Sequence, residues 1–346
     1  MKRATDRAAL AAAALLPLLG PILGAAAPAP PPPLGLPPVP WPAEYPYHPE
    51  RAALGRLLFF DRQLSSDGTV ACATCHDPAR AFTDGAPVST GIRGRRGTRS
   101  APSLVNRAYS RLQFWDGRAA SLEEQVREPL ANPAEMTLDP DPATAHAACV
   151  ARLRAVPGYA PRFAAAFGSP AVTLERISLA IAAFERTLLS GNSLYDRYRA
   201  GDRSALSAAQ ARGLALFSGK AGCADCHMGS QLTDGAFINT GVSWSRTPRD
   251  PGRAGVTQAA EDTGAFKTPT LREIERSAPY MHDGSLRTLA DVVEFYDRGG
   301  GANPYLDERM RPLRLSPAEK EDLVAFLRAL GGEGWQHALA PPELPR

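Results

Sequence analysis

The chain has 346 residues, of which 44% are hydrophobic and 22% are charged, and its formal net charge is +3. This length is sufficient for two domains that each bury a core, and the composition excludes a disordered chain and a polytopic membrane protein. A charge so close to neutrality gives no reason to expect a nucleic-acid partner.

Residues 1–27 have the order of a secretory signal peptide. Basic residues precede a short apolar run that is broken by Pro17 and Pro21 and followed by small residues. The run is too short and too interrupted for a permanent membrane span, although an uncleaved anchor stays open as an alternative. We therefore expect an exported, periplasmic protein with no permanent membrane span after signal cleavage.

A proline-rich segment, residues 28–44, follows the predicted signal peptide. Because its prolines have no backbone N–H to donate, we expect an extended leader, with the folded part beginning near Tyr45. Next comes a helical run, "LGRLLFF", with Gly55 and Phe59, and the run "RGLALFSG" repeats this spacing with Gly213 and Phe217. The repeat indicates a duplicated unit.

Each repeated run is followed by the motif C-x-x-C-H. Its members are Cys72, Cys75 and His76 in the first copy and Cys223, Cys226 and His227 in the second. Two thiols at this spacing reach the two vinyl groups of a haem, while the next imidazole lies under the iron. Two copies predict two covalently bound c-type haems. Zinc held by four cysteines does not require these histidines, and no βαβ pattern supports thioredoxin-like pairs.

The remaining helices are predicted from apolar periodicity and caps. Between the motifs, Ile177, Ile181, Phe184 and Leu188 share one helical face, and Gly191 is the expected stop. Capping boxes are expected at Ser207 with Gln210, Thr288 with Asp291, and Ser316 with Glu319. No convincing strand series appears, so we expect a mainly α fold with long loops. The fifth cysteine, Cys149, is expected to be a small buried hydrophobe.

The sixth ligands of the two irons decide what the haems do. An electron-carrying c-type haem usually has a second protein ligand, commonly Met or His. After His76 there is no histidine until His146, and the only methionine in that interval is Met136. The first iron therefore has few candidates for a distal ligand, and an open iron can bind peroxide.

Two long segments, 113–136 ("QFWDGRAASLEEQVREPLANPAEM") and 266–300, together with the haem motifs resemble the bacterial di-haem cytochrome c peroxidase family, including its MauG-type branch. The similarity extends over roughly residues 50–330. It implies two cytochrome c-like haem domains with long loops. These are an N-terminal peroxidatic haem domain (45–205) and a C-terminal electron-transfer haem domain (206–338).

The resemblance also implies catalytic roles. Trp115 matches a tryptophan that relays electrons between the haems, Gln125 and Glu135 match a distal-pocket pair, and Pro129 matches a proline lining that pocket. Cleavage of hydrogen peroxide needs a proton moved from one oxygen to the other, which suits a carboxylate. The alternatives are a capping or solvated Glu135, a packed Trp115 and a surface Gln125.

The chain departs from typical peroxidases at both irons. The loop after His76 lacks the histidine that often ligates the resting first iron, so that iron should be open from the outset. At the second iron, Tyr296 occupies the usual methionine position, as in the MauG-type branch. A core tyrosine bonded to a carbonyl, or a sulfur ligand from Met281 or Met310, stays open there.

Two further expectations concern ions and charges. The family holds a calcium ion between its domains, which here gives Ser100, Ser277 and Pro279 as candidate ligands. Serine in place of the family's asparagine weakens such a site. His282 is expected near the haems, as in the family. The arginines of the loop after the first motif are expected to form a solvated basic loop; they are Arg93, Arg95, Arg96 and Arg99.

Three functions follow in order of preference. The first is a periplasmic di-haem peroxidase that reduces hydrogen peroxide with electrons from a small redox protein, a cytochrome c or a cupredoxin. The second is a MauG-like, peroxide-dependent oxidase that modifies residues of a partner protein. The third is a non-catalytic di-haem electron carrier.

Overall fold

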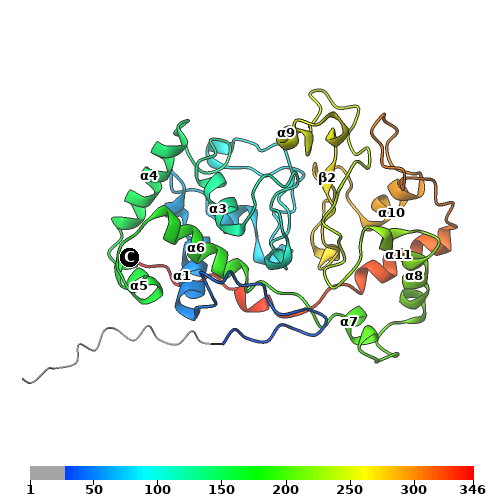
Figure 1. Ribbon diagram of the computed structural model, residues 1–346, viewed down its shortest axis with the longest axis horizontal. Helices are drawn as coiled ribbons and strands as arrows, with labels where there is room; N and C mark the ends of the chain where they lie inside the picture. The colour runs from blue at the N-terminus through cyan, green and yellow to red at the C-terminus, as the bar shows by residue number, and fades with distance from the viewer. Residues whose placement is uncertain (1–27) are drawn as a thin grey trace, which may run out of the picture.

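The computed structural model describes residues 28–346, so the predicted signal peptide lies outside the described residues. Two helical units lie side by side, each containing one C-x-x-C-H motif (Figure 1). The expected mainly α class is confirmed. Within residues 28–346, no helix combines the length and hydropathy that crossing a bilayer requires.

The elements divide between the units as follows. The first unit contains α1 (Pro49–Phe60), α2 (Cys72–Cys75), α3 (Leu122–Leu130), α4 (Pro142–Arg154), α5 (Tyr159–Phe167) and α6 (Leu174–Glu185). A short helix, α7 (Leu194–Arg199), connects it to the second unit. That unit contains α8 (Ala208–Ser218), β1 (Phe237–Ile238), α9 (Ala254–Thr257), β2 (Phe266–Lys267), α10 (Leu289–Asp297) and α11 (Pro317–Arg328). The two strands form one short antiparallel pair.

The first core is built where α1 crosses α6. Gly55 permits this close approach, because a Cβ atom there would lie 1.8 Å from the carbonyl oxygen of Ala180. One turn along each helix, Phe59 and Phe184 meet with ring centroids 5.2 Å apart. Both rings are buried, so the small residue and the aromatic pair together set the helix separation.

The second core repeats this arrangement where α8 crosses α11. A Cβ atom at Gly213 would lie 2.0 Å from the carbonyl oxygen of Asp322. Phe217 and Phe326 then meet with centroids 5.1 Å apart. The spacing shared by the two sequence runs therefore corresponds to a shared packing, as expected for a duplicated unit.

The helix boundaries agree with the predictions except at one end. All three predicted capping boxes are present, at the starts of α8, α10 and α11. The prediction that Gly191 ends α6 is wrong, because α6 already ends at Glu185. The Thr187 hydroxyl donates to the Phe184 carbonyl at 2.7 Å, and Leu188 N donates to Glu185 O at 3.0 Å. These bonds satisfy the last carbonyls in a tighter turn.

Both terminal segments run beneath the junction of the two units (Figure 1). The proline-rich segment is extended, as expected, but it packs on the body ahead of Tyr45. Asn192 N donates to Leu34 O at 2.7 Å, and the Tyr109 hydroxyl donates to Pro37 O at 2.8 Å. At the other end, Trp335 and its neighbours return to the first unit's hydrophobic core. The two segments therefore add non-local contacts across the junction.

Candidate active site

The two motif histidines are held in the same way. His76 Nδ1 lies 2.9 Å from the Phe82 carbonyl oxygen, and His227 Nδ1 lies 2.9 Å from the Leu232 carbonyl oxygen. Because a carbonyl can only accept, each Nδ1 carries the proton and each Nε2 keeps a free lone pair. Burial lowers the pKa of both rings, which favours the neutral form. Both histidines are therefore prepared to bind an iron through Nε2.

The motif cysteines are free and unpaired. Burial raises the pKa of Cys75 to about 11 and that of Cys223 to about 12, so the thiols stay protonated and are not activated nucleophiles. Four thiols at the C-x-x-C-H spacing, each pair followed by a neutral imidazole, fit covalent attachment of two haems. Cys149 is fully buried on α4, as expected, and burial raises its pKa to about 11.

The predicted distal carboxyl of the first site, Glu135, lies in the turn after α3. Asn132 Nδ2 donates to Glu135 Oε1 at 2.6 Å, and burial raises the pKa of Glu135. The pKa of Cys75 is raised mainly by burial, and the charge of Glu135 contributes to it, so this carboxyl lies close to the first motif. Gln125 and Pro129 lie one turn apart on α3 and are half-buried.

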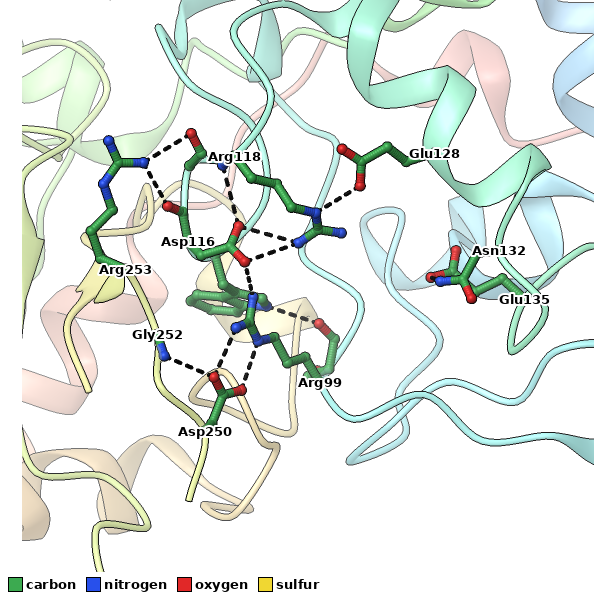
Figure 2. A network of polar contacts seen from close by, with 12 residues as sticks. Arg99, Asp116, Arg118, Glu128, Asn132, Glu135, Asp250, Gly252 and Arg253 are labelled. Atoms are coloured by element: carbon green, nitrogen blue, oxygen red, sulfur yellow. Dashed lines mark hydrogen bonds and ion pairs between the residues drawn. The ribbon is translucent and has the colours of Figure 1, made fainter. Parts of the chain in front are cut away.

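One residue near this pocket was missed by sequence reasoning. Arg118 Nε donates to Glu128 Oε2 at 2.7 Å, and Arg118 Nη1 donates to Asp116 Oδ2 at 3.1 Å (Figure 2). Burial is the main influence on the Glu135 pKa, and the positive charge of Arg118 opposes it. Arg118 thus favours an ionised Glu135. The "WDGR" run contained this arginine, but sequence alone did not reveal its partners.

The second motif lines a cavity that both units form. Cys223, Cys226 and His227 contribute one wall, and Trp115 contributes from the first unit. Tyr296 lines the same cavity; burial raises its pKa, and the neighbouring thiols raise it further. Ligation of the second iron by Tyr296 stays a prediction.

The sulfur alternatives for the second iron remain geometrically open. Met281 and Met310 line the same cavity as Tyr296. Met281 lies in a turn with φ of 74°, immediately before His282. His282 also lines this cavity, and its ring stacks on Phe266 with centroids 3.6 Å apart. The chain therefore presents a phenol and two thioethers to one site.

Two basic side chains on this cavity, Lys267 and Arg107, support the fit to a haem. Lys267 is 5% exposed, and its Nζ contacts the Ser110 hydroxyl and the Leu112 carbonyl. Burial lowers the pKa of Lys267 to about 5 and that of Arg107 to about 10. In the described part of the chain, their printed hydrogen bonds go to neutral groups. The carboxylates of a haem would favour the protonated form of both side chains. Neither residue was selected from the sequence.

Trp115 lies between the two sites. Its indole Nε1 donates to the Ser100 carbonyl at 2.9 Å, and its ring lines the second cavity. Two residues beyond Ser100, the Pro102 carbonyl interacts with the His76 ring. The segment that binds the indole therefore also contacts the histidine of the first site.

The calcium expectation stays a prediction. Ser100, Ser277 and Pro279 do line one cavity. However, Ser100 O already accepts the indole hydrogen, and Ser277 Oγ donates to Ile274 O at 3.2 Å. In the described residues no group of three or more His, Cys, Asp or Glu side chains is arranged for a metal ion.

The basic loop behaves as expected at three positions and not at the fourth. Arg93, Arg95 and Arg96 are exposed. The prediction is wrong for Arg99, whose side chain is only 18% exposed and is paired with Asp116 and Asp250. Neither carboxylate is near Arg99 in the sequence, so the loop composition alone could not identify these partners.

The geometry defines a class: a c-type cytochrome with two haem-binding motifs, each with a histidine held for an iron. Comparisons agree with this class. Residues 49–204 match the family "Di-haem cytochrome c peroxidase", and residues 210–331 match "Cytochrome c". The chain belongs to the di-haem cytochrome c peroxidase family. It is therefore an oxidoreductase with two covalent c-type haems and two cytochrome c-like domains, as the sequence predicted.

Individual relatives carry two kinds of name. The chain is 43% identical to the methylamine utilization protein MauG of Methylorubrum extorquens, over 89% of this chain and 85% of that protein. It is 39% identical to a cytochrome-c peroxidase of Pseudomonas sp. (strain SCT), over 86% of each chain. Among solved structures, a MauG-like protein associated with microbial copper homeostasis matches with a TM-score of 0.81 and 34% identity, over 89% of this chain and 97% of that one.

Proposed function

We propose that the protein is an exported, periplasmic di-haem peroxidase that reduces hydrogen peroxide to water with electrons from a small redox protein, a cytochrome c or a cupredoxin. The observation that carries the proposal is the difference between the two sites. The first has a half-buried carboxyl, Glu135, beside its motif, whereas the second has a phenol, Tyr296, facing its motif. One site is suited to proton transfer, and the other is suited to a stable six-coordinate iron.

In the first site, Glu135 is the acid and base. When bound there, the haem supplies the iron chemistry that accepts the oxygens of peroxide. Glu135 takes the proton from one peroxide oxygen and returns it to the other, which leaves as water. Asn132 holds the carboxyl in place through its 2.6 Å hydrogen bond, and Gln125 orients the peroxide from α3. Pro129 completes the pocket wall one turn further along.

Electrons enter by way of the second site and Trp115. The cavity containing His227 is lined by the Trp115 indole, so this ring is the natural connection between the sites. Tyr296 ligates the second iron in this proposal. A phenolate donor favours ferric and higher oxidation states, so the potential of this haem should be low.

The direct test is stoichiometric peroxide added to the holoprotein. We expect a change in haem absorption, followed by oxidation of a reduced cytochrome c or cupredoxin in steady state. No absorption change on mixing would refute the peroxidase. Replacing Trp115 with Phe should slow donor oxidation while leaving peroxide binding at the first site intact.

A MauG-like activity is the second candidate, in which the oxidising equivalents modify residues of a partner protein. The position of Tyr296 on the second cavity and the 43% identity to a MauG favour it. In that case peroxide generates a long-lived oxidised state without prior reduction, and Tyr296→Phe abolishes it. Rapid decay of that state together with fast turnover of a reduced cytochrome would favour the peroxidase.

A further inference from the structure

Arg99 connects the Trp115 segment to the second unit. Its Nη1 donates to Asp116 Oδ2 at 2.6 Å, while its Nε and Nη2 donate to the two carboxylate oxygens of Asp250 at 2.7 and 2.8 Å (Figure 2). Asp116 and Asp250 are mostly shielded from solvent. One guanidinium therefore joins carboxylates from both units at the same point, in a geometry that lysine cannot reproduce.

A second bond lies directly beside this pair. Trp115 Nε1 donates to the carbonyl of Ser100, the residue after Arg99, at 2.9 Å. Asp116, which Arg99 binds, is the residue after Trp115. Arg99 and Ser100 are thus bonded to Asp116 and Trp115. The Arg99–Asp116 bond joins two side chains, and the Trp115–Ser100 bond joins a side chain to the backbone. The indole cannot turn without breaking one of these bonds.

The second unit holds the same segment from the other side. Lys267 N donates to the Trp115 carbonyl at 2.8 Å, and Arg253 Nη1 donates to the Asp116 carbonyl at 2.9 Å. The Arg99 guanidinium also lies 5.4 Å from the centre of the Phe266 ring. The orientation of Trp115 relative to the second cavity therefore depends on the docking of the two units.

The charges keep this arrangement in place across the ordinary pH range. Burial alone would raise the pKa of Asp116 and of Asp250. The hydrogen bonds and positive charge of Arg99 outweigh burial at both, so each pKa lies below its usual range. Both carboxylates are ionised at neutral pH, and Arg99 remains their shared cation.

We propose that Arg99 is a positioning residue for electron transfer between the haems: together with Asp116 and Asp250 it fixes the Trp115 indole between the two sites. The proposal rests on the proposed function, since it assumes that electrons pass by way of Trp115. It adds that the transfer rate depends on a contact between the two units that touches neither haem motif.

The test measures the rate of electron transfer between the haems in the holoprotein. The second haem is reduced beforehand, peroxide is mixed in, and absorption follows oxidation of that haem. Arg99→Leu should slow this step by about 10-fold to 100-fold, because displaced redox groups transfer poorly, while haem content and peroxide binding stay unchanged. Arg99→Lys should restore little of the rate, because one ammonium does not span both carboxylates.

A matched control is available in the second unit. Arg212 also binds a carboxylate with two bonds, at 2.7 and 2.8 Å from Asp322, but contacts no part of the Trp115 segment. Arg212→Leu should leave the transfer rate unchanged. If Arg99→Leu does not fold, Asp250→Asn weakens the contact to the second unit, because the amide loses the charge and one of the two acceptor oxygens, and should slow transfer by a smaller factor.

A double-mutant cycle separates positioning from general damage. In a Trp115→Phe background, Arg99→Leu should cause no further slowing, because the group it positions is gone. Unchanged transfer in Arg99→Leu or in Asp250→Asn would overturn the proposal. Equal slowing with and without Trp115 would overturn it as well. A wild-type protein whose haems do not respond to peroxide would instead refute the proposed function, and with it this inference.

Discussion

At the scale of single residues, the two sites share their proximal side and differ on the distal side. His76 and His227 donate through Nδ1 to backbone carbonyls at the same distance. The first motif has the half-buried carboxyl of Glu135 beside it, and the second faces the phenol of Tyr296. In the proposed function, this difference gives the two sites different chemistry.

Glu135→Gln tests the proton-transfer role. The amide cannot accept the peroxide proton, so we expect peroxide cleavage to slow by about 10²-fold to 10⁴-fold with haem content unchanged. Rapid mixing with peroxide, followed by haem absorption, measures this rate. A Gln variant as fast as the wild type would remove Glu135 from the mechanism.

The pH dependence of the same step has a definite sign. Burial raises the pKa of Glu135, so its carboxylate becomes protonated at a higher pH than an ordinary glutamate. A protonated carboxyl cannot take the peroxide proton, and the cleavage rate should therefore fall as pH decreases through this raised pKa. The Gln variant should lack this acidic limb, and an identical profile in both proteins would contradict the assignment.

At the scale of elements, a glycine and an aromatic pair set each helix crossing. The repeated spacing of Gly55 with Phe59 and of Gly213 with Phe217 was visible in the sequence, and so were the capping boxes, because both are local patterns. The end of α6 was not visible in the sequence, because a hydrogen bond from the Thr187 side chain ends the helix before Gly191. The partners of Arg99 and Arg118 were hidden for a similar reason: they depend on tertiary packing.

Gly55→Ala and Gly213→Ala test the two crossings. An added Cβ would meet backbone carbonyls at 1.8 and 2.0 Å, so the paired helices must separate. We expect each change to destabilise its own unit by about 1–3 kcal/mol, despite the better helix propensity of alanine. Gly97→Ala is the control, because its nearest neighbour would lie 3.7 Å away. Thermal unfolding of the holoproteins measures the difference, and unchanged melting of both helix variants would contradict the packing.

At the scale of the whole molecule, the connection between the units contains a buried ion pair. Arg272 donates to both carboxylate oxygens of Asp196 on α7, at 2.8 and 2.9 Å, and the two side chains are 1% and 4% exposed. The Ser190 hydroxyl lies beside it and donates to Glu273 at 2.6 Å. This polar network, with the two terminal segments, holds the units in one arrangement.

Arg272→Leu should therefore destabilise the molecule strongly, by about 3–5 kcal/mol, because it leaves the Asp196 carboxylate buried without its cation.

Burial would raise the pKa of Asp196, but Arg272 outweighs it and lowers that pKa. The stabilisation is thus present above the unfolded-state pKa and is lost as pH falls through the lower folded-state pKa. Denaturant unfolding at neutral and acidic pH measures both effects. Arg212→Leu, at an exposed pair, should destabilise the molecule far less, and an equal cost for the two variants would contradict this account.

The sequence predicted the helical class, both haem motifs and the candidate distal residues, since these depend on local patterns and on a family resemblance. It did not predict that Lys267 and Arg107 lie on the second cavity, because a basic residue in a loop carries no local sign of its tertiary surroundings. Nor did it predict that the proline-rich segment packs on the first unit and on the connection between the units. Each of these features depends on contacts between residues far apart in the chain.

The central claim is that one iron is open to an oxidant while the other is closed by the protein. Electron paramagnetic resonance of the resting, fully ferric holoprotein tests this claim most directly. The account predicts one high-spin and one low-spin ferric signal of equal amount, with the low-spin signal altered in Tyr296→Phe. Two low-spin signals would contradict it and would indicate a non-catalytic electron carrier.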